Sequence, residues 1–187
     1  GAGLGGGSSD AAFMLKMLNE LFNLKISNDQ LKQYAAQLGS DCSFFLENKP
    51  CFVAGRGDVM KPSAINLSGY HIVVVHPNVF VNTSWAYQEL AANRKKTGSL
   101  NSFSETKKSD SVNSIGVAVN NPIEKWNQYL KNDFEAVVFH QHPEIESIKD
   151  HLYEKGALYA SMSGSGSAVY GIFREEIETD FYPEFKI

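Results

Sequence analysis

Apolar residues at helical spacing follow directly after a glycine-rich opening of the chain. The apolar positions 11, 14, 15, 18, 21 and 22 recur every three to four residues, which predicts a half-buried helix over residues 11–22. Ser8, Ser9 and Asp10 stand just before this pattern, where N-cap residues are favoured. Five of the first seven residues are glycine, which argues against a helix or packed strand there and indicates a loop whose backbone comes close to something else.

A second, shorter helical pattern follows the first. Ser27 and Gln30 have the spacing of a capping box, and Gly39 stands where a helix would end. The pattern therefore predicts a helix between residues 27 and 39. Its buried face is expected to comprise Leu31, Tyr34, Ala35 and Leu38.

The remaining patterns predict strands and helices in turn. Strands are expected at 51–58, where the run ends in a glycine turn, and at the β-branched run 70–75. Helices are expected at 122–130 and 145–155, and a strand–turn–strand unit at 157–173. Residues 93–114 are polar and predict a surface loop. A domain boundary near residues 68 and 69 would divide the chain into 1–68 and 69–187.

Composition restricts the classes of function. The chain has 187 residues, enough for one large or two small domains, and 43% of them are hydrophobic, so a packed core is expected. The net charge of −4 argues against nucleic acid as the main partner, and no apolar run approaches the roughly 18 residues that span a membrane. Cys42 and Cys51 are too few for a disulfide framework or a zinc site, and they suit a reducing cytosol.

The chain opens on Gly1, with no methionine and no strand in front of the glycines. A loop of this kind needs a rigid element leading into it, so we expect a preceding segment of about a hundred residues, a typical domain's length. Any targeting peptide would belong to that segment. The expected location is the bacterial cytoplasm, with a plastid as the alternative.

A glycine loop that leads into a helix N-terminus suits phosphate. The first turn of a helix leaves N–H groups unpaired, and the helix dipole places partial positive charge there. A loop without Cβ atoms lets an anion reach these donors. One charge at a helix start gains only about 0.3–1 kcal/mol, so tight binding needs the loop N–H groups, the serine hydroxyls and a metal together.

Three phosphate-loop patterns and a flexible linker compete for this stretch. The Walker A pattern fails because no lysine followed by Ser or Thr comes after the glycines. Gly1, Gly3 and Gly6 meet the dinucleotide pattern, but residues 23–29 lead into a helix instead of the required strand. A linker would not lead into a capped amphipathic helix. The third pattern is G-L-G followed by a double serine.

Asp41 stands between the second predicted helix and an apolar run. A carboxylate there could accept a proton or hold a cation, whereas spacing alone favours an N-cap for the next turn. His140, His142 and His151 do not group with cysteines or acids, so we assign no transition metal.

Several of these motifs together resemble the GHMP small-molecule kinases, which include galactose, homoserine and mevalonate kinases. The opening GAGLGGGSSDAA is similar to their phosphate loop, and most similar to the branch that acts on a cytidine-diphosphate-linked methylerythritol. Residues 39–45 are similar to the element G-[AS]-D-x-x-F-F/V, with Cys42 and Ser43 in place of the usual Val-Pro. Residues 162–169 resemble the third family motif, about 160 residues after the first and in the family's order, and the resemblance implies that this turn lies against the phosphate loop.

Weaker similarities connect these motifs. Residues 76–83 resemble an H-P-x-x-x-x-x-T segment that leads into a helix beside the substrate, and residues 132–135 resemble an N-D-[LF]-E element with a structural role. The resemblance covers nearly the whole chain except residues 93–114 and those after 174. It implies an α+β fold, in which residues 1–68 complete an N-terminal domain similar to ribosomal protein S5 domain 2. Residues 69–187 would form a C-terminal antiparallel sheet with helices, and the active site would lie in the cleft between the domains.

The resemblance also implies an activity: ATP-dependent phosphorylation of the 2-hydroxyl of the methylerythritol in non-mevalonate isoprenoid precursor synthesis. ATP and Mg²⁺ would be the cofactors, and the enzyme would be a monomer or a homodimer. Asp41 would be the catalytic base, Thr83 and Tyr87 would bind substrate, and the Tyr87 ring would stack on cytosine. Ser9 would bind Mg²⁺. The nucleotide-binding residues would be Gly1, Ala2, Gly3, Leu4, Gly5, Gly6, Gly7, Ser8, Ser9 and Asp10.

Two other interpretations stay open. One is another kinase of the same family, acting on homoserine or mevalonate. The other is a nucleotide-binding protein that retained the loop but not turnover. The family also places a lysine near its N-terminus to act with the Asp, and because this chain does not contain that lysine, the 187 residues alone are expected to be inactive.

Overall fold

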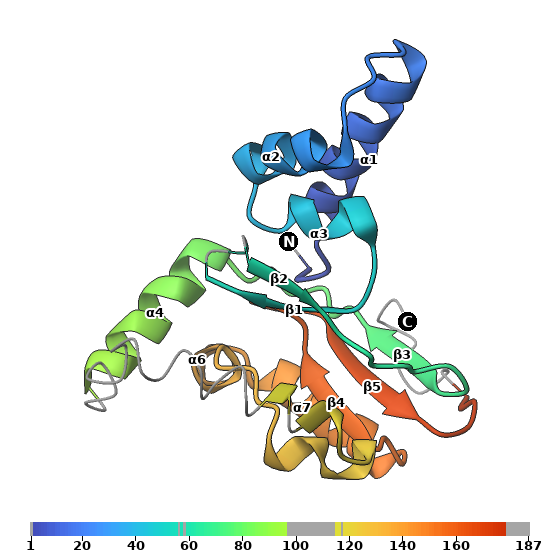
Figure 1. The fold of residues 1–187 in the computed structure, drawn as a ribbon. Coiled ribbons are helices and arrows are strands. Elements are labelled where there is room, and N and C mark those ends of the chain that lie inside the picture. The colour runs from blue at the N-terminus through green and yellow to red at the C-terminus, as the bar shows by residue number, and fades with distance from the viewer. Residues whose placement is uncertain (1, 56, 58, 97–114, 117, 179–187) are drawn as a thin grey trace. The chain divides into compact units, whose positions relative to one another are not determined.

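Figure 1 shows the computed structural model, which describes residues 2–55, 57, 59–96, 115, 116 and 118–178. The chain divides into two compact units, one of Gly5–Asn66 and one of Gly1–Leu4 with Leu67–Ile187. Both units combine helices with antiparallel strands, which confirms the predicted α+β class. The division into domains at residues 68 and 69 stays a prediction. Gly1 and residues 97–114 of the predicted loop lie outside the described residues.

The unit Gly5–Asn66 contains three helices followed by a β-hairpin. Its helices are α1 (Gly6–Leu21), α2 (Asn28–Leu38) and α3 (Cys42–Glu47), and its strands are β1 (Cys51–Ala54) and β2 (Val59–Pro62). The strands pair antiparallel, with Cys51 opposite Pro62. The three helices enclose a small apolar core of Ala12, Leu31, Ala35, Cys42 and Leu46.

Helix α1 begins earlier than the sequence predicted. Its N-cap is Gly5, so Ser8 and Asp10 lie inside the helix and the predicted N-cap positions are wrong, as is the exclusion of Gly6 and Gly7 from a helix. The physical reason is the backbone of Gly5, whose φ of 67° is in the left-handed region. Glycine adopts this conformation readily, so the loop can turn directly into the helix at this point.

The predicted apolar face of α1 is only partly buried in this unit. Ala11 and Leu15 pack against the core, but Met14, Leu21 and Phe22 are 50%, 69% and 64% exposed. The predicted half-buried helix is therefore present, but only part of its apolar face is buried among the described residues. Within the unit, α1 packs against α2 and α3, and a helix in contact with neighbours on one side buries only that side.

Helix α2 has the predicted boundaries. Ser27 Oγ accepts a hydrogen bond from the Gln30 N–H, and the Gln30 side chain accepts one from the Ser27 N–H, which completes the capping box. Of the predicted buried face, Leu31 and Ala35 are buried, whereas Tyr34 and Leu38 are exposed.

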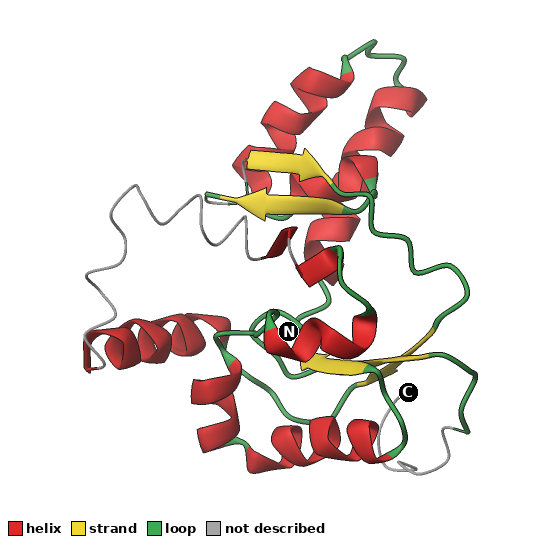
Figure 2. Ribbon diagram, turned by 60° about the horizontal axis from the view of Figure 1, so that its bottom comes forward, coloured by secondary structure: helices red, strands yellow, loops and turns green. Residues whose placement is uncertain are grey.

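The other unit is built on a three-stranded antiparallel sheet in the order β3-β5-β4. The strands are β3 (His71–Val75), β4 (Tyr159–Met162) and β5 (Val169–Phe173), joined by α4 (Thr83–Lys96), the 3-10 helix η3 (Ile123–Gln128), α6 (Glu135–Gln141) and α7 (Pro143–Glu154). Figure 2 shows these helices in red beside the yellow strands.

The sheet has two differently covered faces. Val75, Val169 and Met162 lie on one face, where they share a core with Ile145 and other apolar residues of α7. Tyr159 and Tyr170 project to the opposite face, where Trp126 of η3 meets Tyr159 edge to face at 5.8 Å between ring centroids. Burial on that face raises the pKa of both tyrosines. The alternation of a strand therefore supplies a purely apolar face and a mixed one.

Most elements of this unit match their patterns, with three differences. The segment predicted as a helix at 122–130 is a 3-10 helix, and α4 extends through residues 93–96, which were expected to begin a loop. Helix α6 was not predicted, because its short sequence EAVVFHQ contains the β-branched and aromatic run that favours a strand.

Candidate functional site

The two glycine motifs of the sequence meet in the structure. The Ala168 N–H donates a hydrogen bond to the Ala2 carbonyl at 3.1 Å, and Ser163 Oγ donates one to the Gly3 carbonyl at 2.7 Å. Gly3 has φ +74°, and a Cβ placed on it would lie 2.0 Å from the Ser163 carbonyl oxygen. A residue with a side chain cannot occupy this position without moving the backbone, so Gly3 is fixed against the turn between β4 and β5.

The turn that holds Gly3 is itself fixed by hydroxyl groups. Ser167 Oγ donates a hydrogen bond to the Val79 carbonyl at 2.6 Å, and Ser167 is fully buried. Ser165 Oγ lies 3.1 Å from Thr83 Oγ1, at the start of α4. The serines of this motif thus connect the turn to the segment between β3 and α4.

The start of α1 presents a row of backbone donors. The Ser9 N–H is bonded to the Gly5 carbonyl at 2.9 Å, so the N–H groups of Gly6, Gly7 and Ser8 precede the first helical hydrogen bond. A Cβ placed on Gly6 or Gly7 would meet nothing within 4 Å among the described residues. The space beside Gly6 and Gly7 is therefore open within this unit, and the dipole of the 16-residue helix makes the helix start favourable for an anion.

Asp41 occupies the N-cap position of α3 without acting as a cap. Its side chain makes no capping hydrogen bond within the described part of the chain, so the N-cap interpretation accounts for its position but not for its carboxylate. The side chain is exposed, and one oxygen accepts a hydrogen bond from Ser40 Oγ at 3.2 Å. Helix α3 also carries Phe45, whose ring lies 2.8 Å from the point where a Cβ on Gly5 would be.

Thr83 and Tyr87 share one face of α4, because they are four residues apart on the helix. The Tyr87 ring is 60% exposed and packs edge to face against Phe134 at 4.8 Å. An ordinary core residue would not be exposed to this extent. Trp85, by contrast, is partly buried against the core of the unit.

The predicted site residues are shared between the two units. Ala2, Gly3, Leu4, Thr83 and Tyr87 belong to the unit with the three-stranded sheet. Gly5, Gly6, Gly7, Ser8, Ser9, Asp10 and Asp41 belong to the other. Among the residues that the structure describes, no three His, Cys, Asp or Glu side chains form a group that could hold a metal ion, and no helix is long and apolar enough to cross a bilayer.

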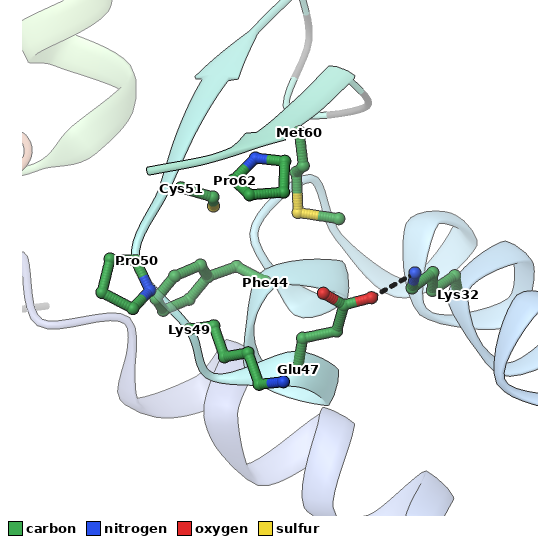
Figure 3. Close-up of a pocket in the computed structure, with 8 residues that line it drawn as sticks. All are labelled: Lys32, Phe44, Glu47, Lys49, Pro50, Cys51, Met60 and Pro62. Carbon is green, nitrogen blue, oxygen red and sulfur yellow. Dashed lines mark ion pairs between the residues drawn. The ribbon is translucent and has the colours of Figure 1, made fainter. Parts of the chain in front are cut away.

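The sequence did not indicate a hollow in the unit Gly5–Asn66, between α3 and the hairpin (Figure 3). Its volume is about 380 Å³, and it is lined by Lys32, Phe44, Glu47, Lys49, Pro50, Cys51, Met60 and Pro62. Lys32 and Glu47 form an ion pair, and the hydrogen bond from Lys32 lowers the pKa of the Glu47 carboxyl. Burial raises the pKa of the Cys51 thiol, which disfavours the reactive thiolate. None of the predicted site residues is among the eight lining residues.

Comparison with known families assigns the chain to a class. A family model described as the GHMP kinases N terminal domain matches residues 1–49, and one described as GHMP kinases C terminal matches residues 117–181, so that the two together cover more than half of the chain. The chain belongs to the GHMP kinase family.

Individual relatives are named more specifically. The chain is 49% identical over 176 residues to 4-diphosphocytidyl-2-C-methyl-D-erythritol kinase of Bacteroides thetaiotaomicron, covering 94% of this chain and 58% of that protein. It is 41% identical over 181 residues to the protein of the same name from Porphyromonas gingivalis, covering 96% and 61%. A crystal structure of 4-(cytidine 5'-diphospho)-2C-methyl-D-erythritol kinase superposes with a TM-score of 0.64 at 28% identity, over 92% of this chain and 57% of that one. The chain spans about three fifths of the length of these relatives.

Proposed function

We propose that the full-length protein is an ATP-dependent kinase that phosphorylates the 2-hydroxyl of 4-diphosphocytidyl-2-C-methyl-D-erythritol. The family membership supports ATP as the phosphate donor, and the names of the relatives support the acceptor. Because the named relatives are bacterial, we place this activity in the bacterial cytoplasm, in a monomer or a homodimer.

The observation that carries the proposal is the open row of amides at the start of α1. Glycine in a helix costs up to about 1 kcal/mol relative to alanine, yet a Cβ on Gly6 or Gly7 would meet nothing within 4 Å in the described part of the chain, so packing there does not require glycine. A phosphate group that approaches the backbone closely would require it. The N–H groups of Gly6, Gly7 and Ser8 would then donate to the ATP phosphates, with Ala2, Gly3, Leu4 and Gly5 shaping the loop in front of them.

Mg²⁺ fits this loop as a companion of the nucleotide. Mg²⁺ keeps several waters and is bound through one or two protein oxygens together with substrate phosphates. We propose that Ser9 Oγ supplies one such oxygen, while Ser8 Oγ and the first turn of α1 bind phosphate. The cation would neutralise phosphate charge during the transfer.

Asp41 is proposed as the general base. Phosphoryl transfer depends mainly on positioning and charge stabilisation, and a carboxylate that accepts the proton of the attacking hydroxyl is the one group with a direct chemical role. An exposed carboxylate without a capping bond suits that role. On the acceptor side, the exposed ring of Tyr87 would stack on the cytosine base, and Thr83 would bind the same substrate one helical turn away.

The test is a transfer assay on the full-length protein with ATP and three acceptors: the cytidine-linked methylerythritol, homoserine and mevalonate. We expect phosphorylation of the first alone, and its loss on Asp41→Asn. Transfer to homoserine or mevalonate would reassign the protein within its family. Binding of ATP with no transfer to any of the three would favour the catalytically silent binding protein.

A further inference from the structure

The segment Asn132–Glu135 makes contacts that a general structural role does not explain. The Asn132 side chain donates two hydrogen bonds through Nδ2, to the Met162 carbonyl and to the Gly164 carbonyl, both at 2.8 Å. Its Oδ1 accepts a hydrogen bond from the Phe134 N–H at 3.0 Å, which fixes the carboxamide relative to its own backbone. One side chain thus restrains two carbonyls that flank Ser163.

The residue between those carbonyls is the one that holds the nucleotide-binding loop. Ser163 Oγ donates to the Gly3 carbonyl at 2.7 Å, and the Ser163 carbonyl accepts the Gly166 N–H at 3.0 Å. Gly164 is also in contact range of Gly3, since a Cβ on Gly164 would lie 3.3 Å from the Gly3 carbonyl oxygen. The contacts therefore run without a gap from Asn132 through the turn to the loop.

Glu135 binds the other backbone group of Met162, its N–H. Its Oε1 accepts the Met162 N–H at 2.9 Å and Ser161 Oγ at 3.1 Å, while its Oε2 pairs with Lys149 Nζ at 2.6 Å. The Glu135 side chain is only 13% exposed, so these bonds are partly protected from water. The N–H and the carbonyl of Met162 are thus both bound by side chains of one four-residue segment.

We infer that Asn132 is a positioning residue for nucleotide binding, which acts on the loop at Gly3 by holding the carbonyls of Met162 and Gly164 in place. This inference rests on the proposed function in so far as the loop binds ATP. The hydrogen bonds themselves can be tested without it. Phosphate binding through backbone amides depends on their orientation, so a turn that moves would weaken binding before it affects the chemical step.

The experiment uses two variants of the full-length protein and one matched control. Asn132→Asp keeps the acceptor for the Phe134 N–H but replaces the donor by an oxygen that faces two carbonyl oxygens. Asn132→Ser keeps an acceptor but is too short to reach both carbonyls, and it serves if the aspartate variant does not fold. The control is Asn19→Asp in α1, because Asn19 Nδ2 also donates to a loop carbonyl, that of Ile26 at 3.1 Å, while its Oδ1 accepts the Ile26 N–H.

Amide hydrogen exchange and steady-state kinetics are measured on the unsubstituted protein and on the three variants. The Gly166 and Ala168 N–H groups report the turn, since they bond to Ser163 and Ala2. In both Asn132 variants we expect their exchange to accelerate about tenfold or more and the KM for ATP to rise about tenfold, the size of effect that losing one or two neutral hydrogen bonds produces. The kcat should change less than the KM, and Asn19→Asp should leave both readouts unchanged.

Two results would overturn the inference. One is unchanged exchange at Gly166 and Ala168 in folded Asn132 variants. The other is an equal KM change in Asn19→Asp, which would mean a general loss of stability. If the unsubstituted protein transfers no phosphate, the proposed function fails, and ATP binding measured by calorimetry replaces the KM while the exchange data still decide whether Asn132 holds the turn.

Discussion

The two halves of the opening loop use glycine for different reasons. At Gly3, a Cβ would lie 2.0 Å from the Ser163 carbonyl oxygen, and at Gly5 it would lie 2.8 Å from the Phe45 ring. Both residues also have positive φ, at 74° and 67°. At Gly6 and Gly7 the backbone is helical, and a Cβ would have no described residue within 4 Å outside its own helix backbone and chain neighbours.

Internal packing and backbone conformation thus explain the first two glycines but not the second two. A glycine that neither conformation nor a neighbour requires lowers the stability of a helix, so a different cause is needed for Gly6 and Gly7. Close approach of a ligand to the amides provides one. The contrast predicts that substitutions in the first half reduce stability, whereas those in the second half reduce function and leave or improve stability.

The largest expected effect concerns Asp41, a side chain that packing also leaves unexplained. In the full-length protein, Asp41→Asn should lower kcat by about 10²–10⁴-fold, the usual contribution of a general base. The stability of this variant should equal that of the unsubstituted protein, because the carboxylate makes no capping bond within the described part of the chain. Phosphate transfer at saturating substrates measures kcat, and a thermal melt on the same sample measures stability. A kcat within a few-fold of the unsubstituted protein would exclude the role of base.

Gly3→Ala should give the largest loss of stability. A left-handed conformation costs a residue with a side chain roughly 1–2 kcal/mol, and the overlap with the Ser163 backbone adds to this, so we expect about 2–4 kcal/mol in total. Denaturant unfolding of the full-length protein measures the change. The matched control is Gly69→Ala, where φ is +86° but a Cβ would meet none of the described residues within 4 Å, so that only the conformational part is lost. Equal losses at both positions would mean that the contact between loop and turn contributes nothing.

The sequence predicted these contacts only in part. The glycines, the double serine and the SGSGS turn could be identified as motifs, because the conformations that they need are local and few residue types adopt them. That the turn meets the loop came from the family resemblance, since no local rule relates residues so far apart. The start of α1 was misplaced for a local reason: glycines count against a helix in propensity, although a left-handed Gly5 allows one to begin directly after it.

The sequence alone does not predict the role inferred for Asn132. Asn132 and Glu135 bond to atoms of β4 and of the turn after it, which lie 26 to 32 residues further along the chain, and the packing of α7 on the sheet and of α6 on α7 brings them together. The sequence therefore indicates only a structural role for residues 132–135. Burial was misjudged for a related reason, since periodicity identifies an apolar face on α1 but not whether an element of the unit covers it.

Gly7→Ala tests the second half of the loop and should separate stability from function. Alanine in the first turn of α1 should stabilise the protein by about 0.5–1 kcal/mol, because it restricts the unfolded chain and favours the helix. The added methyl group should also obstruct the amides and raise the KM for ATP by about tenfold, equivalent to one lost hydrogen bond to a charged group. On the full-length protein, calorimetric melting measures the change in stability and steady-state kinetics measure the KM for ATP.

The matched control for Gly7 is Gly116→Ala. Gly116 is also helical, and a Cβ on it would likewise meet nothing within 4 Å among the residues that the structure describes. It should gain similar stability without any change in KM. If Gly7→Ala leaves the KM unchanged as well, the open space at the start of α1 is not where the nucleotide binds, and the contrast between the two halves of the loop loses its functional meaning.

The smallest effect is expected at the hollow in Figure 3, where the Lys32–Glu47 pair lies at the surface. The hydrogen bond from Lys32 lowers the pKa of Glu47 in the folded state, so the pair stabilises the protein above the ordinary glutamate pKa, and this contribution is lost as the pH falls through the lowered value. Both side chains are at least one third exposed, which limits the contribution to about 0.5 kcal/mol or less. Glu47→Gln should therefore lower stability slightly at pH 7, and the loss should shrink as the pH falls below the ordinary glutamate pKa, as measured by urea unfolding, with the exposed Glu20→Gln of α1 as the control. This sets the scale of an ordinary surface change in the unit Gly5–Asn66, against which the gain at Gly7 is judged. A loss above about 1 kcal/mol would place the pair among the groups that hold α2 and α3 together.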